Sequence, residues 1–265
     1  MTEERKAPTA PGSEIDGKRV REVIRVRGIR RTLAEHMHRS LQVSAQLSGS
    51  LAIDMTAMNK CREMLNANEK ETGVHYTYTD MFVKVVAEAL KLNPLMNSSL
   101  MERDILVWDD INVGVALDFE MRDGRRGLIV PVVRRADEKT VLEIHSILEG
   151  IKEKGREGKL MPDDTLGGTF TLTNVGAFAG QQLKTGRATG MASFGTPILN
   201  QPQVGILGTG SINDTPVVVD GQIVIRPIMY CNLTYDHRVL TGADAAAFSG
   251  SIVRHMLDPG SLLSE

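Results

Sequence analysis

Hydrophobic side chains recur along the chain with two different spacings, and these spacings predict its helices and strands. A spacing of three or four residues predicts helices over 30–44, 55–70, 81–91, 140–157 and 242–257. Alternating or continuous β-branched and aromatic residues predict strands over 19–26, 47–53, 105–108, 111–118, 127–133, 167–176 and 223–234. The two kinds of element do not alternate regularly, so the sequence predicts an α+β fold with a mixed β core and helices packed over it.

Three further features refine this prediction: the N-terminal segment, one helix cap and one histidine. Residues 1–20 are charged and rich in Pro, Gly and Ser, which predicts a flexible N-terminal lead-in before one domain over 21–265. Thr79 and Asp80 are the predicted N-cap of the helix over 81–91. His145 falls on the helix over 140–157, where we expect a surface or boundary residue.

Composition narrows the class of protein. The 265 residues are 42% hydrophobic and carry a net charge of −2, which favours neither nucleic acid nor an anionic membrane as a partner. No apolar run is long enough to span a membrane and no secretory signal begins the sequence, so we expect a cytoplasmic protein. Cys61 and Cys231 lie far apart, and His36 and His38 fall on different helix faces, so no metal site is predicted.

A histidine stands between the last predicted strand and the last predicted helix. The run is Tyr235-Asp236-His237-Arg238-Val239, followed by Thr241-Gly242-Ala243-Asp244. Rigid elements on both sides are what a general base needs, because its position must be fixed. Taken alone, however, the run equally fits a hydrogen-bonded structural histidine, which is the commoner case.

A second informative stretch is Gly167-Gly168-Thr169-Phe170-Thr171-Leu172-Thr173-Asn174-Val175-Gly176. Threonines alternate with apolar residues, which is typical of a strand with one polar face. Such a face usually serves only for pairing across neighbouring strands.

Together these two stretches resemble the catalytic domain of the dihydrolipoamide acyltransferases, the E2 components of 2-oxoacid dehydrogenase complexes. The resemblance runs from about residue 20 to 258 in the family's order. Its other motifs are Gly28–Met37, Tyr78–Lys84 followed by Leu95–Ser98, Asn112–Ala116, Gly127–Val133 and Thr196–Gly208. One position departs: the family has Asp or Asn four residues after the histidine, where this chain has Thr241.

The resemblance implies a chloramphenicol-acetyltransferase-like fold, assembled as a homotrimer with active sites between subunits. Whether such trimers stand alone or pack into a larger cage stays open. It implies acyl transfer between dihydrolipoamide and coenzyme A, a substrate here, in the core of a 2-oxoacid dehydrogenase complex. His237 would be the general base, and the Thr173 hydroxyl of a neighbouring subunit would donate to the oxyanion. No metal is implied. The lipoyl group would come from a separate domain or chain, with E1 and E3 components or a lipoyl-domain protein as partners.

Residues that support the site also follow from the resemblance. The residue at position 241 would bond an arginine of the opening helix, for which Arg30 is the candidate, and so organise the loop of His237. Thr241 cannot make a bidentate pair with guanidinium. Three alternatives stay open: Asp236 or Asp244 takes over this role, a water fills the gap, or the loop of His237 is looser.

Two other functions stay open. Thr241 and the lack of an Asp-Lys-Ala lipoyl hairpin favour a scaffold or ligand-binding module with little activity. A coenzyme A-dependent acyltransferase with another acceptor is the third hypothesis. The sequence does not predict which acyl group is transferred, because the residues of an acyl pocket would be ordinary apolar side chains. The segment Gly180–Gly195 is a candidate to lie near an interface or channel mouth, since it follows the strand of Thr173.

Overall fold

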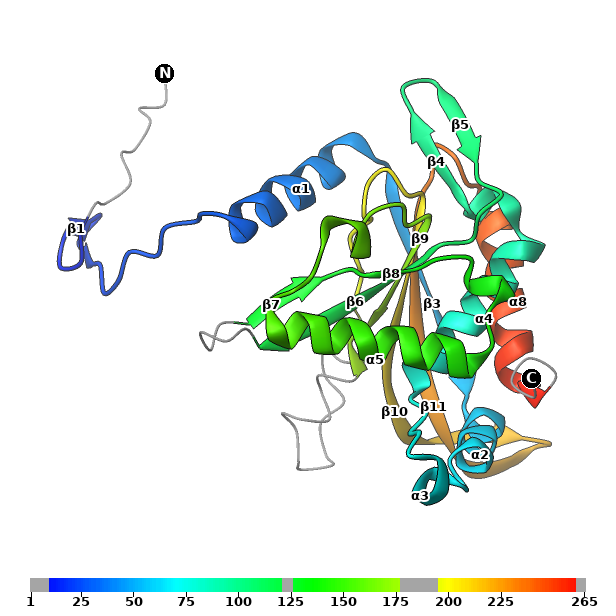
Figure 1. The fold of residues 1–265 in the computed structure, drawn as a ribbon. Helices are drawn as coiled ribbons and strands as arrows, with labels where there is room; N and C mark the ends of the chain where they lie inside the picture. The colour runs from blue at the N-terminus through cyan, green and yellow to red at the C-terminus, as the bar shows by residue number, and fades with distance from the viewer. Residues whose placement is uncertain (1–9, 121–125, 177–194, 261–265) are drawn as a thin grey trace. The chain divides into compact units, whose positions relative to one another are not determined.

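The computed structural model describes residues 10–120, 126–176 and 195–260 (Figure 1). Contacts divide the chain into two units, Met1–Arg39 and Ser40–Glu265. The first unit holds a short hairpin, β1 (Glu14–Ile15) with β2 (Lys18–Arg19), and most of helix α1 (Ile29–Val43). The strand predicted over 19–26 is therefore wrong beyond Arg19. A strand needs a paired neighbour, and residues 21–27 pair with no described strand.

One mixed sheet organises the second unit, and it confirms the α+β prediction. Strand β9 runs parallel to both of its neighbours, whereas the other pairs are antiparallel. The strand over 127–133 is interrupted at Pro131, which lacks an N–H and accepts from Val115 N at 2.8 Å instead. The strand order is β3 (Gln46–Asp54), β11 (Gln222–Asp236), β10 (Gly205–Val219), β9 (Phe170–Asn174), β6 (Val113–Glu120) and β7 (Arg126–Ile129), with β8 (Val132–Val133) paired to β6.

Three helices lie against one side of this sheet (Figure 1). They are α4 (Tyr78–Leu92), α5 (Val141–Glu157) and α8 (Gly242–Leu257). Their apolar faces and the sheet form the core, in which Phe82, Phe170 and Phe248 are fully buried. Helix α4 begins before the predicted start, because Thr77 is its N-cap and Asp80 completes the capping box. Thr79 is thus not the cap.

Two smaller elements differ from the predictions. The helix predicted over 55–70 is split into α2 (Thr56–Leu65) and α3 (Glu69–Thr72), because the Asn66 side chain bonds the backbone N–H and carbonyl of Tyr76. The strand predicted over 105–108 is β5 (Asp104–Val107), and it forms a separate hairpin with β4 (Ser98–Met101). Among the described residues, no helix is long and apolar enough to cross a membrane.

Candidate active site

His237 lies exposed where the chain leaves β11 and turns towards α8. Its backbone N–H donates to the carbonyl of Ala45 at 2.8 Å. The backbone N–H groups of Val239 and Leu240 both donate to the carbonyl of Asp236, each at 3.0 Å, and close a tight turn. The main chain is therefore fixed on both sides of His237 while the imidazole stays accessible.

The buried carboxylate of Asp236 holds this turn through hydrogen bonds. Its side chain is only 2% exposed, and Oδ2 accepts from the guanidinium of Arg238 at 2.6 Å. Oδ1 accepts from the backbone N–H of Arg238 at 3.1 Å and of Ala45 at 3.3 Å. Burial by itself raises the pKa of Asp236, but the hydrogen bonds and charge of Arg238 outweigh it, so the pKa is lower than usual. An ionised carboxylate thus joins β11, the turn and the start of β3.

Thr241 is the N-cap of α8. Its hydroxyl donates to Asp244 Oδ2 at 2.7 Å and accepts from Asp244 N at 3.3 Å. The Thr241 N–H also donates to Asp244 Oδ2, at 2.8 Å. These hydrogen bonds, first of all the one from the Thr241 side chain, lower the pKa of Asp244. Arg30 lies on α1 in the other unit, so its pairing with position 241 stays a prediction.

Thr173 is half-buried near the end of β9. Successive side chains of a strand point to opposite faces, and Phe170 and Leu172 belong to the core. Thr173 therefore lies on the face away from the core. Its neighbour Asn174 points the other way, and its amide donates to Thr79 Oγ1 at 3.0 Å, which ties this end of β9 to α4.

The sheet register sets the distance between Thr173 and His237. Thr173 lies opposite Gly208 on β10, and Gly208 lies opposite Asn232 on β11, five residues before His237. Two strand spacings and five residues of rise place the two main chains about 19 Å apart. A base and an oxyanion donor must both lie roughly 3 Å from the reacting atoms. The two side chains of one chain are too far apart for that.

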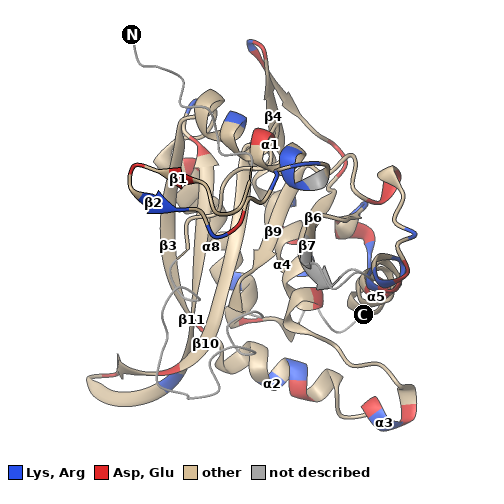
Figure 2. Cartoon of the chain, turned by 90° about the vertical axis from the view of Figure 1, so that its left-hand side faces the viewer, with Lys and Arg blue, Asp and Glu red and all other residues tan. Residues whose placement is uncertain are grey.

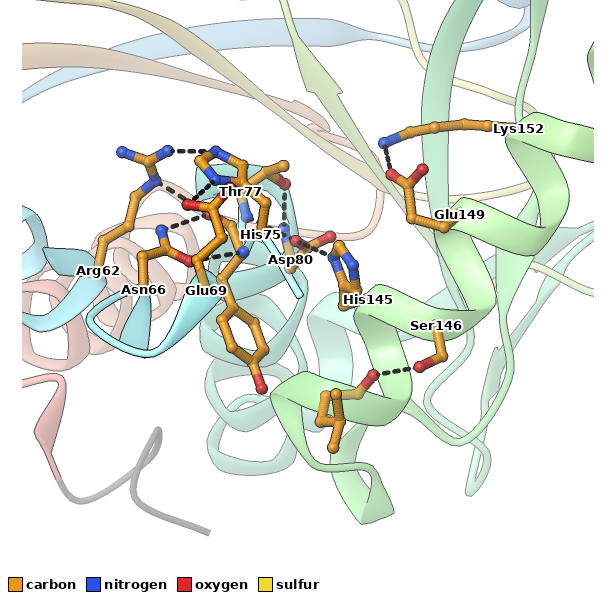
Figure 3. Close-up of polar contacts among 12 residues, drawn as sticks. Arg62, Asn66, Glu69, His75, Thr77, Asp80, His145, Ser146, Glu149 and Lys152 are labelled. Atoms are coloured by element: carbon orange, nitrogen blue, oxygen red, sulfur yellow. Dashed lines mark hydrogen bonds and ion pairs between the residues drawn. The ribbon is translucent and has the colours of Figure 1, made fainter. Parts of the chain in front are cut away.

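A second polar cluster surrounds the start of α4 (Figure 3). The His145 Nδ1 atom lies 3.0 Å from Asp80 Oδ2, and the two side chains are 13% and 1% exposed. His145 is thus a boundary residue, as expected, with a buried carboxylate as its partner. Nearby, His75 contacts Glu69 at 2.9 Å and Arg62 at 3.0 Å. The Asp80–His145 pair joins α4 to α5, and His75 joins α2 to α3 through Arg62 and Glu69. The described part of the chain contains no group of three potential metal ligands.

Comparison with known families identifies the fold. Residues 18–264 match the model of the 2-oxoacid dehydrogenases acyltransferase catalytic domain. The chain belongs to this acyltransferase family. A similar curated relative is the dihydrolipoyllysine-residue succinyltransferase component of the 2-oxoglutarate dehydrogenase complex of Bartonella vinsonii subsp. berkhoffii. It is 35% identical over 243 residues, which are 91% of this chain and 55% of the relative. The chain thus spans about half the length of that relative.

Solved structures of the acyltransferase family share this architecture. The dihydrolipoamide acetyltransferase of Azotobacter vinelandii has a TM-score of 0.79 and 28% identity, over 96% of this chain and 99% of that one. A serine, a histidine and an asparagine four positions after the histidine have been investigated in its catalytic mechanism. The cubic core of a pyruvate dehydrogenase multienzyme complex has a TM-score of 0.78 and 30% identity, over 96% and 99% of the two chains.

The sequence analysis did not predict two contacts of this candidate site. The Asp236–Arg238 pair was visible as opposite charges two residues apart on either side of His237. The Thr79–Asn174 bond was hidden because Thr79 was assigned to the helix cap; the signal for the true cap is Thr77-x-x-Asp80. The segment Gly180–Gly195 falls, except for Gly195, outside the described residues.

Proposed function

We propose that this chain transfers an acyl group between the thiols of dihydrolipoamide and coenzyme A, as the core of a 2-oxoacid dehydrogenase complex. The observation that carries this function is the presentation of His237. It is an exposed imidazole on a turn whose main chain is held by Asp236 and Ala45. The family membership and the spacing of His237 and Thr241, which equals the histidine–asparagine spacing in the Azotobacter protein, support the same reading.

In the proposed reaction, His237 takes the proton from the attacking thiol as its sulfur bonds the thioester carbonyl carbon. A free thiol titrates near ~8.5, so without a base little of it is the nucleophilic thiolate at neutral pH. The carbonyl oxygen becomes an oxyanion, to which the Thr173 hydroxyl donates. The original C–S bond then breaks, and the leaving sulfur takes the proton back from His237. No electrons are gained or lost overall.

The two halves of the site belong to different subunits in this proposal. The separation of about 19 Å between Thr173 and His237 along the sheet supports this arrangement. At least a trimer is expected, and the cubic core among the similar structures supports assembly into a cage. A lipoyl-bearing domain or chain would deliver the acyl group, and E1 and E3 components would complete the complex. The named relatives differ in acyl group, succinyl in one and acetyl in the other.

A weakened or altered activity is the second candidate, and Thr241 favours it. In this chain the hydroxyl of Thr241 is used to cap α8. Its side chain is also short and neutral, and it cannot make a bidentate pair with an arginine guanidinium. A scaffold with an inactive site, or a transferase with another acyl acceptor, would each be consistent with that change.

The direct test is turnover with acetyl-CoA or succinyl-CoA and free dihydrolipoamide. We expect activity with at least one donor, and a loss of roughly 10²–10⁴-fold in His237→Ala. Thr173→Ala should lower kcat by about 10²–10³-fold with little change in coenzyme A affinity. His75→Ala is the matched control, because its ring bonds only surface partners in the described cluster. Wild-type turnover in His237→Ala would refute the proposed base.

A screen of other acceptors separates the remaining candidates. Activity with another thiol or amine, but not with dihydrolipoamide, would identify an altered acceptor. A protein that still assembles but shows no activity with any acceptor would favour the scaffold.

A further inference from the structure

The Thr173 hydroxyl takes its position from the main chain of β9. Thr173 lies opposite Gly208 on β10 and Ala116 on β6, and neither neighbour has a side chain that can form hydrogen bonds. A Cβ atom added at Gly208 would lie 3.6 Å from Thr173 Cγ2, so the Thr173 methyl group lies close to that strand. Strand β9 contains no charged residue (Figure 2). It can therefore offer an oxyanion a neutral donor, whose effect depends on a distance of about 2.7–3.1 Å.

Main-chain contacts hold the end of β9 within the plane of the sheet. The N–H of Val175 donates to the carbonyl of Thr209 on β10 at 2.9 Å. A Cβ atom added at Gly176 would lie 2.2 Å from the carbonyl oxygen of Gly210, so the two main chains are in direct contact there. Both contacts join this part of the chain to its neighbour in the sheet. They restrict movement perpendicular to the sheet much less, and that is the direction in which the Thr173 side chain points.

Asn174 provides a contact along that direction. Its Nδ2 atom donates to Thr79 Oγ1 at 3.0 Å, and Thr79 belongs to α4, one of the helices that lie against the core side of the sheet. Because neighbouring residues of a strand point to opposite faces, Asn174 holds the main chain towards α4 while Thr173 points away from it. Loss of this bond would therefore move the Thr173 hydroxyl along the line on which it meets an oxyanion.

The acceptor, Thr79, lies in a turn of α4 that is itself held in place. Asp80 follows it, and Asp80 Oδ2 accepts from the N–H of Thr77 at 2.7 Å in the capping box. The same oxygen lies 3.0 Å from His145 Nδ1 on α5 (Figure 3). The first turn of α4 is thus a fixed point to which the end of β9 is bonded.

We propose that Thr79 and Asn174 are positioning residues for acyl transfer, and that their hydrogen bond sets where the Thr173 hydroxyl meets the oxyanion. This inference rests on the proposed function, in which Thr173 is the oxyanion donor. The oxyanion forms only as the reaction proceeds, so a displaced donor lowers kcat and leaves the binding of coenzyme A unchanged. A bond that served stability alone would change the melting temperature without this selective effect on kcat.

The first experiment removes the acceptor. Valine has the shape of threonine without its oxygen, whereas serine keeps the hydroxyl. We expect Thr79→Val to lower kcat roughly 10-fold or more, with the KM for coenzyme A within about twofold of wild type. Thr79→Ser should restore most of the kcat. Wild-type kcat in Thr79→Val would overturn the proposal. If Thr79→Val does not assemble, Thr79→Ala is compared with Thr79→Ser instead, because these two variants differ only in the hydroxyl.

The matched control is Thr215→Val on β10. The Thr215 hydroxyl is also half-buried, and it donates to the carbonyl of Asn213 at 3.0 Å, in a part of β10 that does not pair with β9. Thr215→Val should keep the wild-type kcat. A loss of kcat in this control as large as in Thr79→Val would show a general effect of losing a hydroxyl and would overturn the proposal.

The second experiment places Thr79→Val in the Thr173→Ala background. Without a Thr173 hydroxyl there is nothing left to position, so Thr79→Val should cause little further loss of kcat there. An equal fold-loss in both backgrounds would show that the Thr79–Asn174 bond serves stability alone, and would overturn the proposal while the proposed donor stands.

The third experiment does not depend on activity. In methyl NMR spectra of threonine-labelled protein, the Thr173 signal is identified by its loss in Thr173→Ala. This signal should shift or broaden in Thr79→Val and stay unchanged in Thr215→Val. An unchanged Thr173 signal in Thr79→Val would overturn the proposal. If the signal moves but Thr173→Ala keeps the wild-type kcat, the proposed donor is refuted, and the inferred role in acyl transfer falls with it.

Discussion

Replacing Asp236 with asparagine tests whether one buried carboxylate holds the turn of His237. Asparagine keeps the shape and can still accept from the backbone of Ala45 and Arg238, but it loses the charge-assisted pair with guanidinium. Hydrogen bonds to charged groups contribute about 1.5–3 kcal/mol. The Arg238 side chain is 41% exposed and can turn to water, which limits the loss. We therefore expect Asp236→Asn to lower the free energy of unfolding at pH 7 by about 2 kcal/mol.

The pH dependence gives the sign of this effect. The pKa of Asp236 is lowered in the folded chain, whereas an unfolded aspartate titrates near ~3.9. Its contribution is therefore complete well above that value and is lost as the pH falls through the lower, folded pKa. The difference between wild type and Asp236→Asn should be full at pH 7 and shrink as the pH falls below about 4.

The assay is calorimetric melting at one fixed protein concentration, because assembly also shifts the melting temperature. About 2 kcal/mol corresponds to a fall of roughly 4–8 °C in Tm. Turnover should fall roughly tenfold or more, since small displacements of a catalytic group are costly. Asp220→Asn is the control: Asp220 is exposed at φ 50°, a conformation asparagine also tolerates. A difference between wild type and Asp236→Asn that stays constant from pH 7 to pH 3.5 would refute this reasoning.

Three further predictions concern other positions. Gly205→Ala should lower the free energy of unfolding by about 1–3 kcal/mol, because the new Cβ would lie 2.6 Å from the ring of buried Phe170. The control Gly250→Ala, in open space on α8, should not destabilise the fold. Equal denaturation midpoints for the two variants would contradict this prediction. Thr241→Asn should keep the N-cap and raise turnover with dihydrolipoamide, whereas lower turnover would mean that the site is adapted to threonine. Burial raises the pKa of the Cys231 thiol to about 12, so thiol reagents at pH 8 should not react with Cys231 until the protein unfolds. Rapid labelling of Cys231 in the native protein would contradict this prediction.

Elements with an unbroken pattern could be predicted from the sequence. Helix α8 was predicted over its observed residues, and α5 and β11 nearly so, because their apolar spacing and end signals agree. Strand β10 was not predicted, since Gly, Ser, Asn and Pro interrupt its sequence and pairing with β9 and β11 sustains it. Strand β4 was missed for a similar reason: Ser98 and Ser99 show no alternation.

The candidate site likewise has features that could be predicted from the sequence and features that could not. The turn of His237 is local, so its residues could be identified within ten positions of sequence. The separation of Thr173 and His237 could not, because it depends on the register of three strands that are distant in sequence. The use of Thr241 as a helix cap was likewise not expected, although Thr241-x-x-Asp244 matches the pattern of a capping box.

Mixing two inactive variants tests the central claim, a site shared between two copies, most directly. His237→Ala and Thr173→Ala chains would be unfolded together, refolded and assayed for acyl transfer, with each variant alone treated identically. In a mixed assembly, some sites combine His237 of a Thr173→Ala chain with Thr173 of a His237→Ala chain. Both side chains of such a site are wild type. The account predicts that the mixture regains a substantial fraction of wild-type turnover. Activity no higher than that of the separate variants, in assemblies shown to contain both chains, would contradict it.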